Sequence, residues 1–454
     1  MKKTISVLIS LLLLAGMFYT GNLSVAAEEA KMPSAPDFDF ENEYMYGDYN
    51  AHSLADEDHQ GKIETFEDKE IVYEIINYDH LLEILNSEGN YLIQFSGSWC
   101  HNTRALAPAV QKLAKSYGIR KIYMYDFHFD NKADGNTFIR MTNGKENVGV
   151  NYNYMYGEII SQYLDNLDDW VEYPSSTEAA ITYTNAEGKE TTVARLQEPF
   201  LFLYNKDNKE NNSSADVKRD KYPIVYAFEE MVDRDANGVY VSKKDASGEV
   251  IKDAEGKPER EYITEAFEGR LEKLFQFIKD NKIELASYDK VAALKSKFAS
   301  LADADKLALY PINYSQLVWL LDQPGKTYVL FANPSDDAIN KMVGELNQKA
   351  LDANVKIYLV DNRTDAGIVT KWNYKDREST DFLADDGMLK FMKEDLIARF
   401  FTNLEAKDLT PGTLVAYQID AVDTDGFPAP VVDVTSNAAD LDRVLASLNK
   451  LSGG

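Results

Sequence analysis

Apolar residues in the first half of the chain alternate between strand-like and helix-like spacing. Short apolar runs, typical of buried strands, cover residues 71–76, 91–95 and 122–127. Helical spacing of leucines and other apolar residues covers residues 78–85 and 100–117. Strands that alternate with helices in this way predict an α/β fold with parallel strands.

The same succession of elements occurs a second time. The sequence Ile-Asn-Tyr at 76–78 returns at 312–314, and Lys-Ile-Tyr at 121–123 returns at 356–358. The leucines between these matches keep nearly the same spacing in both copies. A strand–helix–strand–helix–strand unit has therefore been used twice. Because the copies are far apart, they predict two globular domains rather than a solenoid.

Composition changes divide the chain into five segments. A basic start, an apolar stretch and small residues up to Ala27 are typical of a secretory signal peptide. The acidic stretch that follows shows no sustained period, which predicts an extended or disordered spacer. We expect a signal peptide at 1–27, an acidic flexible spacer at 28–69, a first domain at 70–282, a helical linker at 283–305 and a second domain at 306–454.

The N-terminal pattern predicts export to an extracytoplasmic location, in the manner of a secreted bacterial protein. The apolar stretch at 5–19 is shorter than the ~20 residues that a spanning helix needs. The start of a lipoprotein signal at 14–16 is followed by Met17 instead of cysteine, which excludes a lipid anchor. We therefore expect no stable membrane insertion after cleavage. An uncleaved signal anchor is the alternative that the sequence leaves open.

Charge limits the partners of the protein. The 454 residues include 48 basic and 75 acidic side chains, a formal net charge of −27. This charge repels phosphates, so we expect no nucleic-acid partner and no anionic membrane surface. The simpler interpretation is that the negative net charge keeps the protein soluble.

A stretch at 234–262 interrupts the first domain. It contains three Asp-x-x-Gly turns between β-prone stretches, at 235–238, 245–248 and 253–256. Residues 233–238 also match the start of a calcium-binding loop, but its twelfth position holds Lys244 where a glutamate is needed. We therefore predict a β-hairpin insertion here.

Candidate chemistry centres on Cys100, the only cysteine of the chain. Residues 99–103 read Trp-Cys-His-Asn-Thr, follow a predicted strand and open a predicted helix. The free N–H groups of a helix N-terminus stabilise a thiolate, Thr103 can donate its hydroxyl to the sulfur, and a protonated His101 would add positive charge. A buried structural cysteine is the alternative. The five histidines show no metal-ligand spacing, so we expect no metal and no cofactor.

This segment resembles the active-site segment of thioredoxins. In that family a Trp-Cys-x-x-Cys motif opens the second helix, and an Ala-Pro pair follows eight residues after the first cysteine, where this chain has Pro108. Glu198 and Pro199, followed by the apolar run 200–204, resemble the cis-proline segment of the family. The resemblance implies that Pro199 lies beside Cys100 and helps to bind an extended substrate. Trp99 and Glu198 then belong to the substrate-binding surface.

The second copy resembles the family more weakly and lacks the cysteine. The repeat aligns Cys100 with Asp337, whose neighbour Asp336 is also acidic, and both suit the first turn of a helix. Thr410-Pro411 stands where a second cis-proline is expected. The resemblance therefore predicts two thioredoxin-like domains, each with a central mixed sheet flanked by helices. This plan is similar to that of protein disulfide isomerases.

Three positions depart from the thioredoxin pattern. Thr103 replaces the second cysteine, so no internal thiol can resolve a mixed disulfide at Cys100. Gln94 replaces the buried aspartate that assists the second cysteine. Glu198 places a carboxylate before the proline, and a nearby negative charge raises the pKa of a thiol.

We predict a secreted monothiol protein that exchanges thiols and disulfides with exported client proteins or low-molecular-weight thiols. Cys100 is the expected nucleophile, Thr103 and His101 tune its pKa, and Pro199 positions the substrate. The alternative is a redox-silent thioredoxin-fold module that binds proteins or acts as a chaperone. The absence of cysteine from the second copy and the charge of Glu198 favour that alternative.

Overall fold

The computed structural model describes residues 40–55, 65–67, 69–127, 153–185, 187–230, 241–252, 256–363, 383 and 390–450. The predicted signal peptide and the first part of the predicted calcium-loop match lie outside these residues. No helix in the described ranges is both long and apolar enough to cross a membrane.

The first sheet has five strands in the order β1-β3-β2-β6-β7. Strand β3 lies between β1 and the central β2 and runs parallel to both, whereas β6 pairs antiparallel with both β2 and β7. The predicted strand at 91–95 is confirmed as β2, and all five of its residues are buried. The strands are β1 (Tyr73–Ile76), β2 (Tyr91–Phe95), β3 (Ile122–Tyr125), β6 (Phe200–Tyr204) and β7 (Ile224–Glu229).

The second sheet repeats this plan in the order β8-β10-β9-β11-β12. As in the first sheet, its first three strands are parallel, and the fourth pairs antiparallel with the strand on each side of it. The strands are β8 (Leu309–Ile312), β9 (Lys326–Ala332), β10 (Ile357–Asp361), β11 (Leu414–Gln418) and β12 (Val431–Thr435). Two mixed sheets of one topology confirm the predicted fold class, an α/β protein with thioredoxin-like sheets.

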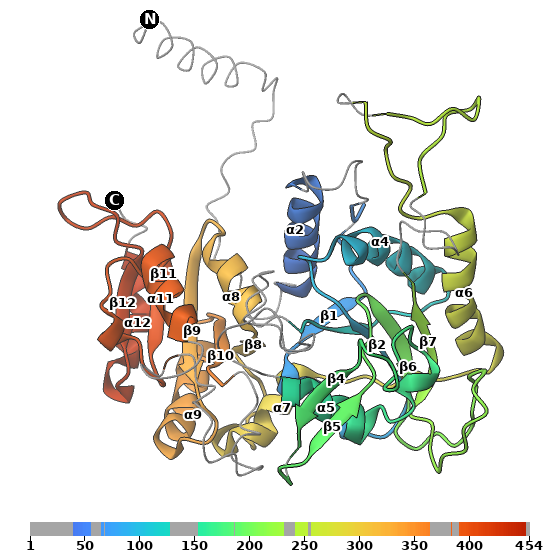
Figure 1. The fold of residues 1–454 in the computed structure, drawn as a ribbon. Helices are drawn as coiled ribbons and strands as arrows, with labels where there is room; N and C mark the ends of the chain where they lie inside the picture. The colour runs from blue at the N-terminus through green and yellow to red at the C-terminus, as the bar shows by residue number, and fades with distance from the viewer. Residues whose placement is uncertain are drawn as a thin grey trace, which may run out of the picture.

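Helices cover both sheets (Figure 1). On the first sheet they are α3 (Tyr78–Asn86), α4 (His101–Ser116), α5 (Asn153–Tyr163) and α6 (Glu265–Asp280), and on the second α8 (Tyr314–Leu321), α9 (Asp337–Asp352), α11 (Lys390–Arg399) and α12 (Leu441–Lys450). Helix α7 (Lys290–Lys297) lies within the predicted linker. Helix α5 packs against a two-stranded hairpin formed by β4 (Ile181–Thr184) and β5 (Glu190–Val193), which the sequence pattern did not predict.

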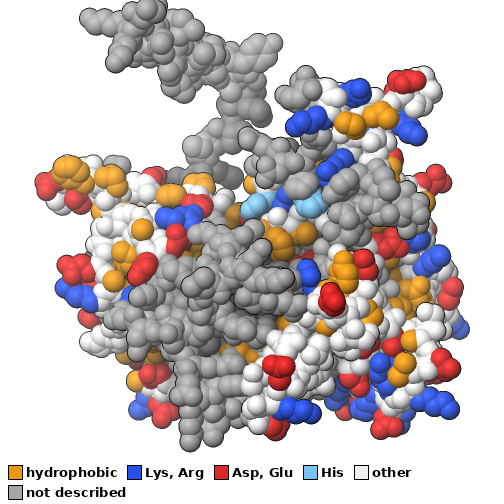
Figure 2. Space-filling model, viewed as in Figure 1, with side chains coloured by type: hydrophobic (Ala, Val, Ile, Leu, Met, Phe, Trp, Pro, Cys, Tyr) orange, Lys and Arg blue, Asp and Glu red, His pale blue; other side chains and the backbone are white. Residues whose placement is uncertain are grey.

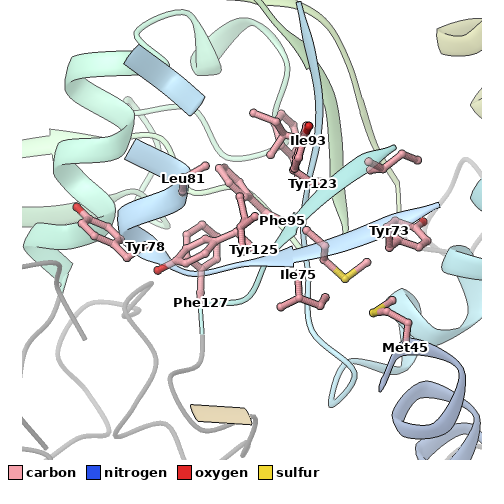
Figure 3. Close-up of a cluster of buried hydrophobic side chains, with 14 of the residues drawn as sticks. Met45, Tyr73, Ile75, Tyr78, Leu81, Ile93, Phe95, Tyr123, Tyr125 and Phe127 are labelled. Atoms are coloured by element: carbon pink, nitrogen blue, oxygen red, sulfur yellow. The ribbon is translucent and has the colours of Figure 1, made fainter. Parts of the chain in front are cut away.

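The spacer prediction is wrong for residues 40–55, which form helix α2 (Phe40–Ala55). Four large side chains on α2 are at most 3% exposed, namely Phe40, Tyr44, Met45 and Tyr49. They belong to a buried cluster that contains the core of the first sheet and one face of the second. Figure 3 shows Met45 of α2 in this cluster with Tyr73 and Ile75 of β1. The helix forms because its apolar side chains gain burial in both halves at once.

Two hairpins project from this frame. Residues 241–252 and 256–262 carry antiparallel bridges, and the turn at 245–248 has Gly248 at φ 87°, as the Asp-x-x-Gly pattern predicts. The predicted turn at 235–238 and most of the one at 253–256 lie outside the described residues. The hairpin between β11 and β12 carries exposed apolar side chains at Ile419, Val422 and Phe427, which gather at one end of the molecule in Figure 2.

The structure corrects the expectation of a second cis-proline. Glu198–Pro199 is the only cis peptide among the described residues, so the Thr410–Pro411 bond is trans. Pro411 and Gly412 form the centre of a turn in which Thr413 N–H donates to Thr410 O at 3.1 Å. Gly412 has φ 88°, the conformation that a type II turn requires after proline. A trans proline therefore suffices to turn the chain into β11.

The structure also shifts the counterpart of Cys100 by one residue. Cys100 is the N-cap of α4, whereas the N-cap of α9 is Asp336 and not the aligned Asp337. The Asp336 carboxylate accepts hydrogen bonds from the N–H groups of Ala338 at 2.8 Å and Ile339 at 3.1 Å. A carboxylate thus satisfies the helix end where the first half places a sulfur.

We predict that Asp336→Ala lowers the free energy of unfolding by about 1 kcal/mol, the usual cost of removing a helix cap. Asp337→Ala, the matched control at the next position, should cost less because Asp337 does not occupy the cap. Urea unfolding measures both. Neither change should alter the alkylation rate of Cys100. Equal losses in the two variants would contradict the assignment of the cap.

Candidate functional site

Helix α4 begins directly after Cys100. The Cys100 carbonyl accepts the first helical hydrogen bond, from Arg104 N–H at 3.0 Å, and Cys100 N–H donates to Gly97 O at 3.1 Å. The side chain is 8% exposed and makes no cap hydrogen bond, so its sulfur is available to other groups. The sequence thus places the thiol at the positive end of a helix dipole.

The cis peptide Glu198–Pro199 lies beside this sulfur. Cys100 Sγ is 3.7 Å from the carbonyl oxygen of Glu198 and donates its thiol proton to it. Pro199 leads into β6, whose residue Phe200 pairs with Phe95 at the end of β2. The antiparallel pairing of β2 and β6 therefore brings together two segments that are about a hundred residues apart in the chain. Cys100, Glu198 and Pro199 meet as the resemblance implied.

Opposing effects act on the Cys100 thiol. Burial is the largest of them and raises its pKa above the usual value, and the negative charge of Glu198 raises it further. Interactions with the N–H and hydroxyl of Thr103 and with the N–H of Asn102 lower the pKa but do not compensate. Burial and Glu198 therefore both oppose ionisation of the thiol. His101 is half-buried at the first position of α4 and is not among these leading causes.

Trp99 is fixed by Asp126, a residue that the sequence pattern did not assign to the site. Its Nε1 donates to Asp126 Oδ1 at 3.0 Å, and Asp126 follows the end of β3. A Cβ at Gly97 would lie 2.2 Å from Asp126 Oδ2 and 2.3 Å from Trp99 Nε1. Glycine is therefore required beneath this pair. Asp126 could have been assigned to the site from the sequence, because it stands at the carboxyl end of a predicted strand that is parallel to β2.

The position of the family's buried aspartate holds a neutral amide network. Gln94 is fully buried; its Oε1 accepts from Tyr73 O–H at 3.1 Å and its Nε2 donates to Ser96 Oγ at 3.0 Å. An amide does not act as a proton acceptor at this depth. Thr103, which stands where the thioredoxin pattern has its second cysteine, is also fully buried. Without that cysteine, an acidic residue at position 94 has no thiol to assist.

Arg104 and helix α2 complete the surroundings of Cys100. Arg104 Nη1 donates to Ser98 O at 2.5 Å and so braces the loop that precedes Cys100. Tyr49 of α2 is buried, and burial together with the negative charge of Asp126 raises the pKa of its hydroxyl. Sequence reasoning missed Tyr49 because it assigned residues 28–69 to a spacer. The described residues contain no group of three or more His, Cys, Asp or Glu that could hold a metal ion.

Comparisons with known proteins give no family. No family model matches the chain, and no curated protein matches it. Among solved structures, "Crystal structure of ERdj5 form II" is 9% identical with a TM-score of 0.18, and "Crystal structure of ERdj5 form I" is 11% identical with a TM-score of 0.18. This chain spans 30% and 29% of those chains, while 84% of it is covered in each case. TM-scores this low carry no argument, so the fold assignment rests on the two sheets themselves.

We predict that Glu198→Gln raises the alkylation rate of Cys100 severalfold at pH 7.5. The change removes a negative charge beside the sulfur, lowers the pKa of the thiol and so enlarges the thiolate fraction. The pH profile of iodoacetamide alkylation measures this as a shift of its midpoint to lower pH. Glu210→Gln is the control, because Glu210 is exposed and follows the far end of β6. A midpoint unchanged from wild type would show that Glu198 does not govern the thiol.

Proposed function

We propose that this protein is a monothiol thioredoxin-fold protein that forms mixed disulfides through Cys100. The observation that supports the proposal is the position of the Cys100 sulfur, at the start of α4 and 3.7 Å from the carbonyl of the cis Glu198–Pro199 peptide. An extended substrate strand that pairs beside Pro199 would bring its own sulfur toward the thiol. Trp99, held by Asp126, would border the same surface.

The proposed reaction is thiol–disulfide exchange with an external disulfide. The Cys100 thiolate attacks one sulfur of that disulfide, a new S–S bond forms and the old bond breaks. The second sulfur leaves as a thiolate and takes up a proton. Cys100 is oxidised and the leaving sulfur is reduced. Because the chain holds one cysteine, a second external thiol must release the product. We therefore expect a long-lived mixed disulfide.

The raised pKa of Cys100 favours a second candidate function, a redox-silent module that binds proteins through the thioredoxin fold. In that case Cys100 would pack as a small buried side chain. The N–H and hydroxyl groups of Thr103 would then have no role in stabilising a thiolate. The two candidates differ in one measurable property. Exchange requires that the folded protein reacts with a disulfide, whereas the binding module requires no reaction.

The test is incubation of the full chain with glutathione disulfide at pH 8. We expect one mixed disulfide per folded chain by intact mass spectrometry, and none in Cys100→Ser. Reaction of the urea-unfolded chain provides the control for an intact thiol. A folded chain that forms no adduct, while the unfolded chain does, would overturn the exchange function and support the binding module.

We further propose that the partners are exported proteins or low-molecular-weight thiols met outside the cytoplasmic membrane. The basic and apolar N-terminal residues support this location, and the net charge of −27 argues against nucleic acid and anionic membranes as partners. We predict a mature chain that begins near Ala27 or Glu28. Mass spectrometry of the protein from its source would contradict this if the membrane fraction held an intact N-terminus.

A further inference from the structure

Helix α2 reaches both halves of the molecule. Its first residue, Phe40, is 1% exposed and lies against three rings of the second half. The ring centroids are 5.7 Å away for Tyr310, 5.7 Å for Trp319 and 5.1 Å for Tyr358. Farther along the helix, a Cβ at Gly47 would lie 3.3 Å from the Trp319 ring. The second half therefore holds α2 by close aromatic packing.

A buried carboxylate fixes the first turn of α2. Glu41 forms an ion pair with Lys290 of α7, which is itself 2% exposed. It also accepts hydrogen bonds from the hydroxyl of Tyr310 at 3.0 Å and from the N–H of Ile75 at 3.1 Å. Gln316 of α8 donates its side-chain amide at 3.3 Å. One side chain thus joins β1 of the first sheet to three elements that follow it by more than 200 residues.

The later part of α2 packs against the half of the molecule that holds Cys100. Helices α2 and α4 are packed together, and the Tyr49 hydroxyl lies 2.8 Å from the sulfur of Met124 in β3. Met124 is the register partner of Gln94 in β2, six residues before Cys100. Tyr49 is 2% exposed, so its hydroxyl is enclosed between α2 and β3. The described parts of α2 therefore pack against α8 of the second half and against α4, the helix that begins after Cys100.

We propose that α2 is an internal cover for the Cys100 site, and that the second half controls access to the thiol by holding α2 in place. This inference rests on the proposed function, because it assigns a regulation to that site. It also gives the cysteine-free half a role, because that half binds Phe40 and Glu41 of α2; these contacts are called the clamp below. Loosening of that clamp would release the helix and expose the sulfur.

Two substitutions test the cover without touching the site. Glu41→Gln leaves Lys290 buried without its counter-charge, and Trp319→Ala removes the ring that faces Phe40, Tyr44 and Gly47. Glu43→Gln is the matched control, because Glu43 lies on the same helix, has a side chain that is 42% exposed and pairs with Lys69. The readout is the rate at which a small maleimide modifies Cys100 in the folded protein.

We expect both substitutions to raise this rate about tenfold, since the rate follows the population of the open form, and the control to match wild type. Hydrogen exchange measured alongside should show lost protection at residues 40–55 with both sheets still protected. Rates equal to the control would overturn the cover, and so would protection lost across both sheets, because exposure would then come from global unfolding.

The outcome for the cover is separable from the outcome for thiol exchange. Faster maleimide modification with no adduct from glutathione disulfide would support the cover and refute exchange. Adduct formation in wild type, with maleimide rates unchanged in Glu41→Gln and Trp319→Ala, would support exchange and refute the cover.

Discussion

The ion pair between Glu41 and Lys290 is the constraint on which the arrangement of the two halves depends. Both side chains are almost fully buried, and a buried charge is tolerated only when it is paired and hydrogen-bonded. Tyr310, Gln316 and the backbone of Ile75 supply the remaining partners. These groups come from both sheets and from α7. Movement of either half away from α2 would remove hydrogen bonds from this buried carboxylate.

At the site, a similar balance acts on a single sulfur. The N-terminus of α4 and the donors at Thr103 favour the thiolate, whereas burial and Glu198 favour the thiol. Burial has the larger effect because water cannot solvate the ion. The chain thus keeps the geometry of a reactive cysteine while it holds the group in its unreactive form. Any motion that brings water to Cys100 would weaken the strongest influence against its ionisation.

The local sequence pattern was sufficient to predict the repeated elements, because each buried strand is a short apolar run. The apolar runs at 91–95 and 200–204 have the same bounds as β2 and β6. The contact of Cys100 with Glu198 and the cis-proline followed from resemblance. Helix α2 could not be predicted from its own neighbours, since its hydrogen-bond partners lie up to 275 residues away and its composition is acidic. Pro411 was misassigned because a proline before an apolar strand also suits an ordinary turn, which Gly412 completes.

The long separation between Glu41 and its partners also orders events in time. Residues near the N-terminus are made first, yet Lys290 and Gln316 emerge from synthesis 249 and 275 residues later. Until then Glu41 of α2 has no Lys290 to pair with, and Phe40 lacks the aromatic rings of the second half against which it packs. Contacts of such long range form slowly, since the intervening chain must first be closed into a loop. The first sheet can therefore assemble early, whereas the contacts of α2 with the second half form only once that half has been made.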